Sequence, residues 1–574
     1  MLPKDVFTRL SDLARSRAAL PLAAVVFAFW LLAQAPGVEP RDDALITLRL
    51  SWNLHEGYGV VGNPGEPPVE GSSSFLWMIL DAWSLKLGGS PLGNARVLGL
   101  FLTVGAVCLL AAAARRTSEP ALAPLVFVLA AATDGFSDMA FNTYESPLLW
   151  FCEALILTLL ALRTQKALRP SRWLEVALGL ALGLTAMTRP EAVLFGAIPV
   201  FWWFAVRRSE RRAGRALLVS LSVFAVFITA YYLGKRSYFG GFLPTSFYLK
   251  VPLTNWTPAA GLSYLRSCAA LHPLWLLALL TALPVGRRSV PYSLRAPALA
   301  GIGCYLVFIL VVRGDLYSHW DRFFQYMLPF WLLLGVQLGS LAPDRVLRPL
   351  SGAAVAASLL LLGGGDHMAV WRSFTSEAAG SNTRCWVDGL ARLQPPPTVP
   401  RYPLPGVPYA RSHRGWYSPV LWVGKVLDGK RLLLEGDMSG NYGYYARPPI
   451  EFLDVYGFTC GPCVEEFLNR GTQWNYLASR RPDVVMLENG PPHGLNGQLL
   501  ARLPDYRLVR LLRHDGEQTA VLVRPDRAAA FEAYSRGGPP VLIPLLGREM
   551  ALPANDVMSR NQFDRDVCEE FLGR

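Results

Sequence analysis

Residues 18–49 read AALPLAAVVFAFWLLAQAPGVEPRDDALITLR and hold the two features that decide the fold. The first is the apolar segment Ala18–Ala33, which approaches the roughly 20 residues that a helix needs to cross a bilayer. The second is the adjacent pair Asp42 and Asp43, which follows shortly afterwards. Two carboxylates beside lipid cost free energy. We therefore expect chemistry at the membrane surface, rather than folding, to account for them.

Apolar blocks recur along the 574 residues, of which 52% are hydrophobic and 17% charged, a balance that soluble domains rarely have. Ala33-Gln34-Ala35 resembles a signal-peptide cleavage site, but the later apolar blocks favour an uncleaved anchor. The candidate spans are Ala18–Ala33, Val97–Ala114, Ala121–Ala132, Leu148–Leu162, Leu174–Met187, Ala192–Val206, Ala216–Leu233, Cys268–Val285, Ala298–Val312, Tyr326–Leu341 and Ser351–Leu362. The sequence therefore predicts a polytopic α-helical membrane protein with about 11 transmembrane helices.

The net charge of +12 would suit a nucleic-acid partner, but its distribution indicates membrane topology instead. If the N-terminus is cytoplasmic, alternate connections should be basic. They are, at Arg115 and Arg116; Arg163, Lys166, Arg169 and Arg172; Arg207, Arg208, Arg211, Arg212 and Arg215; Arg287, Arg288 and Arg295; and Arg345 and Arg348. We therefore predict membrane lipids as partners, and no nucleic acid.

Three regions follow from this topology. Residues 1–363 form the membrane domain, and within it residues 34–92 form one long external loop. Residues 364–574 contain no apolar run of spanning length, and an odd number of crossings places them outside the cytoplasm. The prediction is a C-terminal extracytoplasmic α/β domain. Its expected elements are the strands Arg431–Leu434, Val484–Leu487, Tyr506–Leu512 and Thr519–Val523 and the helix Ala528–Tyr534.

One apolar stretch of the external loop, Phe75–Leu87, is interrupted by Asp81 and Lys86. Such a stretch is typical of a helix that lies in the membrane interface rather than across the bilayer. Trp77 and Trp83 would then lie at the lipid headgroups, where tryptophan is enriched.

The cysteines divide between the two domains. Those in or beside spans are expected to pack as small apolar residues: Cys108, Cys152, Cys268 and Cys304. Those in the external domain allow two disulfides in an oxidising compartment: Cys385, Cys460, Cys463 and Cys568. Cys460-Gly461-Pro462-Cys463 has thioredoxin-like spacing without a βαβ context, so a structural disulfide is favoured over redox catalysis or a metal site.

The topology also gathers polar residues at the external ends of the spans. Adjacent carboxylates repel, and a raised pKa at Asp42 or Asp43 would suit a general base. The pair could also be solvated, start a helix, or hold a divalent cation, although two carboxylates are a weak metal signal. Arginine and lysine suit phosphate. The candidate substrate-binding residues are Arg49, Glu145, Arg189, Glu191, Tyr248, Lys250, Asp315, His319 and Arg322.

Structural alternatives exist for several of these residues. Glu145 could cap the helix that begins near Pro147, because acids are favoured at helix N-termini. Arg189 and Glu191 could form a salt-bridged turn, and the pair Asp315 and Arg322 could be structural too. A further acid, Glu153, lies inside a predicted span and must be neutral, paired or directed at a cavity.

The run Asp42–Arg49, with Glu56–Gly59, Asn63–Glu66 and Val69–Gly71, resembles the first external loop of the GT-C superfamily of bacterial glycosyltransferases. The branch most similar is the terminal arabinofuranosyltransferases of mycobacterial cell walls and their relatives. Further matches, in order, are Tyr144-Glu145-Ser146, residues 183–191, Tyr238-Phe239-Gly240, residues 243–250, Arg313-Gly314-Asp315, Asp321-Arg322-Phe323, residues 440–445 and Asp454-Val455-Tyr456-Gly457. Arg313 and Tyr144 depart from the family pattern, and the Cys460–Cys463 pair is unusual in it.

The resemblance implies a single-sugar transferase of the bacterial cytoplasmic (inner) membrane. Its donor would be a polyprenyl-phosphate sugar, and its acceptor a cell-envelope glycan or glycolipid at the outer face. Asp42 or Asp43 would deprotonate the acceptor, and Arg189, Lys250 and Arg322 would stabilise the departing phosphate. Alternatives are a lipid or solute transporter (flippase), a thiol oxidoreductase that uses the Cys460–Cys463 pair, and a ligase for preassembled glycans.

Overall fold

The computed structural model describes most of the membrane part and much of the C-terminal part of the chain. The described residues are 16, 18–35, 38, 40–118, 120–133, 135–164, 172–206, 213–250, 258–271, 294–312, 322–339, 420–427, 432–436, 443, 444, 446, 450–454, 457–470, 474–489, 496–514, 517–545, 548–559, 562 and 566.

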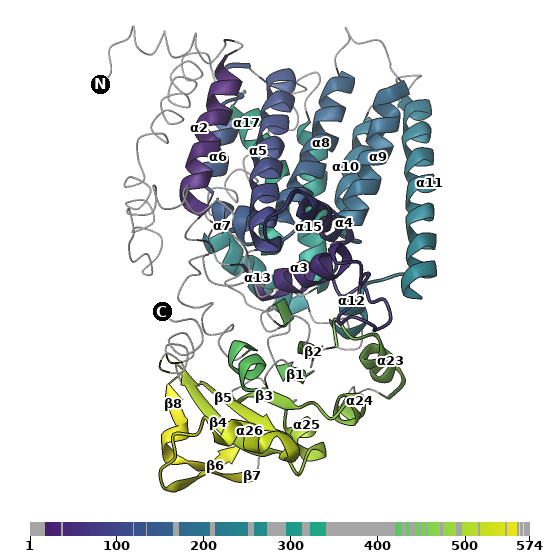
Figure 1. The fold of residues 1–574 in the computed structure, drawn as a ribbon. Helices are drawn as coiled ribbons and strands as arrows, with labels where there is room; N and C mark the ends of the chain where they lie inside the picture. Colours follow the sequence, from purple (N-terminus) through teal and green to yellow (C-terminus); the bar gives the residue numbers. More distant parts are fainter. Residues whose placement is uncertain are drawn as a thin grey trace, which may run out of the picture.

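The N-terminal part is helical, and its longer helices run side by side (Figure 1). The α-helices are α2 (Ala19–Gln34), α3 (Asp42–His55), α4 (Phe75–Ser84), α5 (Pro91–Thr117), α6 (Leu125–Ala131), α7 (Phe136–Phe141), α8 (Ser146–Thr164), α9 (Arg172–Thr188), α10 (Ala192–Val206), α11 (Ala213–Phe239), α12 (Thr245–Lys250), α13 (Pro258–Leu271), α15 (Arg295–Val312), α16 (Arg322–Gln325) and α17 (Leu328–Gly339). Two short 3-10 helices, η2 (Leu85–Leu87) and η3 (Pro120–Leu122), complete this part.

Most predicted spans coincide with these helices. Two do not lie within them: Ser351–Leu362 is outside the described residues, and so is most of Cys268–Val285. In the described part, 4 helices are long and apolar enough to cross a membrane, namely α5, α8, α11 and α15. Shorter apolar helices cover Ala19–Gln34, Pro120–Ala131, Ala192–Ala205 and Leu328–Leu338. The structure therefore supports a helical membrane domain, while the count of about 11 remains a prediction.

Helix α5 shows how the sequence sets the helix ends. Ser90 precedes it, and its hydroxyl accepts a hydrogen bond from the backbone N–H of Gly93 at 3.0 Å, as at many helix starts. Proline occupies the first helical position, where its missing N–H costs nothing. The last turn carries Arg115 and Arg116, which are favourable at the negative end of the helix dipole.

The basic helix ends lie together at one end of the bundle. Helices α5 and α8 both end there, and Arg163 of α8 forms an ion pair with Glu175 of α9 at 3.2 Å. The first external loop lies at the opposite end, beside the C-terminal sheet (Figure 1). This separation of basic connections from the loop agrees with the alternation read from the sequence.

The stretch predicted as an interfacial helix is helical, as α4 followed by η2. One of its two tryptophans, Trp77, differs from the prediction. Trp83 is 70% exposed, whereas Trp77 is buried and donates its indole N–H to the carbonyl of Thr143 at 3.0 Å. Trp77 therefore fixes α4 to the helix bundle instead of contacting lipid headgroups.

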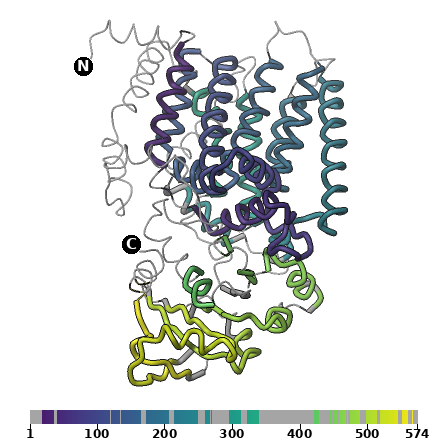
Figure 2. Tube along the Cα trace, viewed as in Figure 1, coloured from purple at the N-terminus to yellow at the C-terminus, as the bar shows by residue number. Residues whose placement is uncertain are grey.

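The C-terminal part contains a six-stranded sheet with strand order β2-β1-β3-β5-β4-β8 and a separate β6–β7 hairpin. The strands are β1 (Leu432–Gly436), β2 (Ile450–Asp454), β3 (Val484–Asn489), β4 (Arg507–His514), β5 (Glu517–Val523), β6 (Pro540–Leu545), β7 (Arg548–Pro553) and β8 (Val557–Ser559). The helices are α23 (Gly461–Arg470), α24 (Trp474–Ser479), α25 (Asn496–Arg502) and α26 (Ala528–Glu532), with 3-10 helices η5 (Pro525–Arg527) and η6 (Ala554–Asp556). Figure 2 shows this mixed α/β region as a compact body beneath the bundle.

All four predicted strands and the predicted helix of this region are present. Strands β4 and β5 pair antiparallel, with His514 opposite Glu517, as the hairpin signal predicted. The elements that sequence patterns missed are short or lie at the sheet edge, such as β2 and β8.

Candidate functional site

The two aspartates that open the sequence argument form the first turn of α3. Asp42 and Asp43 follow the N-cap residue Arg41, where the helix dipole favours negative charge. The alternative that the pair caps the helix is therefore not met as such, because Arg41 is the N-cap and the two aspartates lie in the first turn. The Oδ2 atom of Asp43 lies 3.5 Å from Nη1 of Arg322, and the Asp43 side chain is 36% exposed.

Arg322 comes from a distant part of the chain and begins α16. Its guanidinium lies 4.7 Å from the ring centroid of Tyr144, and its side chain is 13% exposed. A guanidinium over an aromatic ring is stabilised electrostatically. Tyr144, which departs from the family pattern, thus holds Arg322 against the first turn of α3.

A second cluster adjoins this contact and centres on Arg189. The guanidinium binds Oε1 of Glu145 and Oε1 of Glu191, each at 2.5 Å. Tyr326 lies at 3.1 Å from the same guanidinium, and its hydroxyl donates to Glu145 at 2.9 Å. The salt-bridged turn considered for Arg189 and Glu191 is therefore present, as part of a larger buried network.

The electrostatics of this cluster favour ionised side chains. Burial raises the pKa of Glu145, but the nearby charges of Arg189 and Arg322 outweigh it, so that pKa lies below its usual range. Burial lowers the pKa of Arg189, and the surrounding acids outweigh burial there too. Glu145 therefore stays a carboxylate that accepts hydrogen bonds, and it is poorly suited to store a proton.

Tyr326 and Tyr144 are site residues that the sequence reasoning missed as ligand candidates. Tyr326 follows Arg322 by four residues, and its backbone N–H donates to the carbonyl of Arg322 at 3.1 Å. Residues separated by four lie on one helix face. That spacing was the available signal for Tyr326, but aromatic residues are so frequent in this chain that spacing alone does not single it out.

Arg49 has a different environment from the one predicted. It is 3% exposed, and its guanidinium donates to the backbone carbonyls of Gly62, Gly443 and Ala446 and to Oδ1 of Asn63. These acceptors occupy most of its N–H groups. The structure therefore gives Arg49 a role in joining segments of the chain, rather than in binding substrate.

The remaining candidates are less well defined. The ring of Tyr248 contacts Phe247 in α12, with ring centroids 6.0 Å apart. The side chain of Lys250 lies outside the described residues, and so do Asp315 and His319. Within the described ranges, no three His, Cys, Asp or Glu side chains lie together as a metal-binding group.

The acid inside a span, Glu153 of α8, is paired. Its Oε1 accepts a hydrogen bond from the hydroxyl of Tyr305 in α15 at 2.5 Å. Both side chains are fully buried between helices. Glu153 is therefore paired, which is one of the three possibilities that the sequence left open.

A buried ion pair also links the first loop to α11. Nζ of Lys235 lies 2.7 Å from Oε2 of Glu70, and both side chains are almost fully buried. Burial raises the pKa of Glu70 to about 7, against the opposing attraction of Lys235. The folded protein therefore keeps a proton on the Glu70 carboxyl group at pH values where the unfolded chain has lost it.

The pH dependence of stability should reflect Glu70. Because the folded-state pKa is raised, the free energy of unfolding is expected to fall as pH rises from about 4.5 to about 7. Glu70→Gln carries no such proton, so its thermal midpoint should change less over this window. Thermal unfolding of both proteins in detergent across that range tests this. Equal pH slopes for the two proteins would contradict it.

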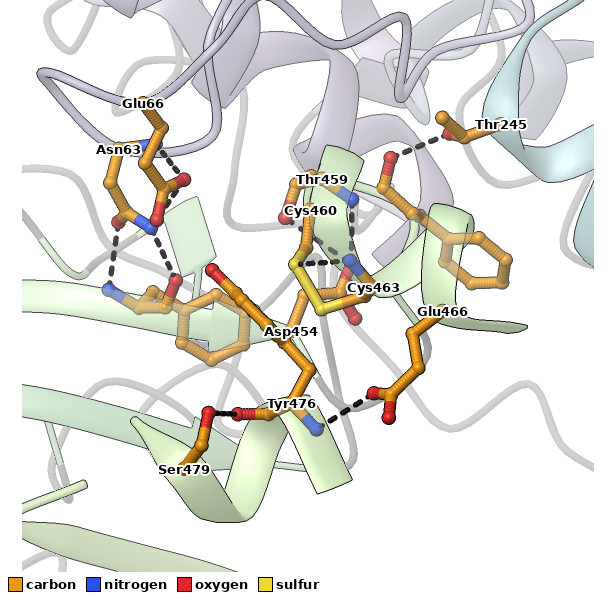
Figure 3. Close-up of a disulfide and its surroundings, with 12 residues drawn as sticks. Asn63, Glu66, Thr245, Asp454, Thr459, Cys460, Cys463, Glu466, Tyr476 and Ser479 are labelled. Carbon is orange, nitrogen blue, oxygen red and sulfur yellow. Dashed lines mark hydrogen bonds between the residues drawn. A yellow bond between two sulfur atoms is a disulfide. The ribbon is translucent and has the colours of Figure 1, made fainter. Parts of the chain in front are cut away.

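The Cys460–Cys463 pair forms a disulfide at the start of α23 (Figure 3). Cys460 is 5% and Cys463 0% exposed, so neither sulfur is accessible to an external thiol. A structural role agrees with this burial. The partners considered in the sequence, Cys385 and Cys568, lie outside the described residues.

Replacing both cysteines tests the structural role. Closing so short a loop stabilises the folded state by about 2 kcal/mol in the chain-entropy account, so Cys460→Ser/Cys463→Ser should lose roughly that much stability. The rate of sugar transfer, the reaction that the sequence resemblance implies, should be unchanged in the folded protein. Urea unfolding and a rate assay on the same preparation separate the two effects. Loss of activity with unchanged stability would favour the thiol oxidoreductase alternative.

Comparisons with known proteins bear on the whole architecture. No family model and no curated protein matches the sequence. The solved structure of ArnT from Cupriavidus metallidurans bound to undecaprenyl phosphate is similar, with a TM-score of 0.57 and 14% sequence identity over 89% of this chain and 99% of that one. The oligosaccharyltransferase of Archaeoglobus fulgidus, solved with zinc and sulfate, aligns with a TM-score of 0.45 and 12% identity over 94% of this chain and 73% of that one. The chain therefore shares its fold with ArnT along nearly its whole length, and ArnT is a GT-C glycosyltransferase, the class that the sequence resemblance predicted.

Proposed function

We propose that the protein transfers a single sugar from a polyprenyl-phosphate donor to a cell-envelope glycan or glycolipid. The observation that carries the proposal is the approach of Asp43 to Arg322 at 3.5 Å. It brings a carboxylate and a guanidinium together at one end of an ArnT-like helical bundle. The ArnT structure holds undecaprenyl phosphate, which supports a polyprenyl-phosphate donor here.

In the proposed reaction, a carboxylate of the first turn of α3 takes the proton of the acceptor hydroxyl. The acceptor oxygen then forms a bond to the anomeric carbon, while the bond between that carbon and the phosphate oxygen breaks. The polyprenyl phosphate leaves with the bonding electrons, and the anomeric configuration inverts. We propose Asp43 as the base, because Arg322 beside it would lie next to the departing phosphate.

Arg322 is suited to the leaving group for two reasons. Phosphate gains negative charge as the bond breaks, and a fixed guanidinium stabilises that charge without reorganisation. The Tyr144 ring lies 4.7 Å from the guanidinium and helps to hold it in place. Lys250 is proposed to add a second positive charge at the donor phosphate, and Tyr248, Asp315 and His319 to bind sugar or acceptor hydroxyls.

The Arg189 cluster is proposed to support this site. Glu145, Glu191 and Tyr326 surround the guanidinium of Arg189, which restricts it to one position. Such a network lies beside the substrates and orients groups rather than moving protons. We assign Arg189 and Glu145 to the binding of donor phosphate and sugar hydroxyls on this basis.

The proposed location is the bacterial cytoplasmic membrane, with the site and residues 364–574 on the extracytoplasmic side. The separation of the basic helix ends from the first loop supports it, because basic connections remain in the cytoplasm. We further propose that residues 1–363 form the membrane domain and that the C-terminal region contacts the acceptor glycan.

A panel assay tests the function. Purified protein in lipid nanodiscs would receive radiolabelled polyprenyl-phosphate hexoses and pentoses, each with a synthetic glycan or glycolipid acceptor. Transfer of one labelled sugar with inversion supports the proposal. Movement of intact label across a vesicle membrane, without a new glycosidic bond, would support a transporter instead. Transfer of a multi-sugar block would support a ligase.

A further inference from the structure

The first external loop and the C-terminal region meet in a contact that we name the loop–sheet junction. Its residues are Arg49, Gly62, Asn63 and Gly71 of the loop, and Gly443, Ala446, Phe452, Phe458 and Thr459 of the C-terminal region. Figure 3 shows Asn63 of the loop beside the disulfide turn that carries Thr459. The junction touches the same helix, α3, whose first turn carries the candidate base.

Arg49 makes the connection from α3 itself. Its Nε donates to the Gly62 carbonyl at 2.8 Å, and its Nη1 donates to the carbonyl of Ala446 at 2.6 Å and to that of Gly443. Its Nη2 donates to Oδ1 of Asn63 at 2.8 Å. Three backbone carbonyls and an amide oxygen, from both sides of the junction, thus fix one buried cation on α3.

Asn63 makes a two-point contact with strand β2. Its Nδ2 donates to the carbonyl of Phe452 at 2.9 Å, and its Oδ1 accepts from the N–H of Phe452 at 2.9 Å. The side-chain amide therefore pairs with both backbone groups of one strand residue, as a neighbouring strand would. This pairing fixes both the position of the loop along strand β2 and its distance from the strand.

Two loop glycines approach the disulfide turn too closely for any side chain. A Cβ atom on Gly62 would lie 2.1 Å from the carbonyl oxygen of Thr459, and one on Gly71 would lie 2.6 Å from that of Phe458. The Thr459 backbone is itself fixed, because its N–H donates to Oδ2 of Asp454 at 2.9 Å. The two surfaces are therefore packed backbone against backbone.

Helix α12 joins the same junction. The N–H of Thr245 donates to the carbonyl of Glu70 at 3.0 Å, and its hydroxyl donates to the carbonyl of Phe458 at 2.6 Å. The loop, α12 and the disulfide turn thus meet at one point. A shift of the C-terminal region would move the loop and α3 with it.

We propose that the C-terminal region positions the candidate base, and that Arg49 is the positioning residue that transmits this constraint along α3. The inference rests on the proposed sugar transfer. Arg49 lies within two helical turns of Asp42 and Asp43. If Arg49 is held in place, the rotation of α3 about its axis and its position along that axis are fixed, and with them the location of both carboxylates. Misplacement of a catalytic group by about 1 Å can reduce a rate by roughly 100-fold.

Arg49→Lys is the first test, since lysine keeps the charge but cannot reach acceptors on several sides. The expected result is a roughly 10- to 100-fold lower kcat with an unchanged KM for the donor, because donor binding depends on other residues. Arg481→Lys is the matched control: Arg481 forms an exposed pair with Asp505 at 2.7 Å, and its kcat should equal that of the wild type. A wild-type kcat for folded Arg49→Lys would overturn the proposal.

Gly62→Ala tests the junction from the loop side, should Arg49→Lys fail to fold. Its control is Gly461→Ala, because a Cβ atom on Gly461 meets nothing within 4 Å. Gly62→Ala should lose kcat and Gly461→Ala should keep it. Equal kcat values for these two variants would overturn the proposal.

Hydrogen exchange separates this inference from the proposed function. In full-length Arg49→Lys, the backbone amides at the start of α3 and in the turn at residues 457–460 should both exchange faster than in the wild type. The amides of α8, which serve as the control, should exchange at the wild-type rate. If the wild type transfers no sugar from any donor, the proposed function fails while the coupled exchange still tests the junction. If exchange rises in the turn but not in α3, the positioning role is wrong.

Discussion

Asp43→Asn is expected to reduce the rate of sugar transfer by roughly 10²- to 10⁴-fold, the range that a general base contributes. Asparagine keeps the shape and position of the side chain but cannot accept the proton of the acceptor hydroxyl. The contact with Arg322 at 3.5 Å would change from an ion pair to a hydrogen bond. Because Asp43 is partly exposed, the fold should tolerate the change.

Two matched variants make this result specific. Asp42→Asn removes the neighbouring carboxylate and should have the smaller effect if Asp43 is the base. Asp505→Asn removes an exposed carboxylate from the sheet region and should leave the rate unchanged. Initial rates at saturating donor and acceptor measure all three. A wild-type rate for Asp43→Asn, with a large loss for Asp42→Asn, would assign the base to the other aspartate, and wild-type rates for both would exclude a base in this turn.

Arg189→Gln is expected to have the largest effect on stability. Arg189 neutralises Glu145 and Glu191 in a buried position, with both contacts at 2.5 Å. Removing one partner of a buried ion pair typically costs about 3–5 kcal/mol, because the remaining charge has lost its compensation. The glutamine variant should therefore unfold at a markedly lower urea concentration than the wild type.

A second substitution distinguishes charge from shape in this cluster. Glu145→Gln added to Arg189→Gln should recover part of the lost stability, because it removes a buried charge. Transfer activity should stay low, since the proposed phosphate ligand is still missing. If the stability losses of the single variants Arg189→Gln and Glu145→Gln simply add in the double variant, the direct pairing of Arg189 with Glu145 is contradicted.

The pH dependence of these variants follows from the lowered pKa of Glu145. In the wild type, this carboxylate contributes stability above its ordinary pKa, and the contribution is lost as pH falls through the lowered value. Without Arg189, burial dominates and the pKa rises. As pH falls towards about 5, Arg189→Gln should then gain more stability than the wild type, because the Glu145 gain adds to the Glu70 gain that both proteins share.

The helices and the fold class were predictable because their signals are local. Apolar runs such as Leu148–Leu162 and Ala216–Leu233 coincide with α8 and α11, since a helix long enough to cross a bilayer needs a continuous apolar sequence. The hairpin of β4 and β5 carried a similarly local turn signal. Short elements such as α7 and α12 lack such a run, and the sequence did not indicate them.

The site was predictable in part. The sequence predicted that Asp43 and Arg322 lie at the same end of the bundle, but it did not indicate that they touch, which the structure shows at 3.5 Å. Arg49 shows the limit of this reasoning. It was predicted to bind substrate together with Arg189, yet it binds backbone carbonyls of the C-terminal region. Nothing within its own segment distinguishes the two.

By itself, then, the sequence determined the helical membrane architecture, the end of the bundle at which charged groups gather, and the α/β character of the C-terminal region. These properties follow from hydropathy and charge, which act over one helix or one connection at a time. Tertiary structure alone decided which of the gathered charges meet: Asp43 with Arg322, Glu145 with Arg189, and Arg49 with the backbone at Gly443. Such pairing depends on the packing of segments hundreds of residues apart, where contacts within a few ångströms decide the outcome.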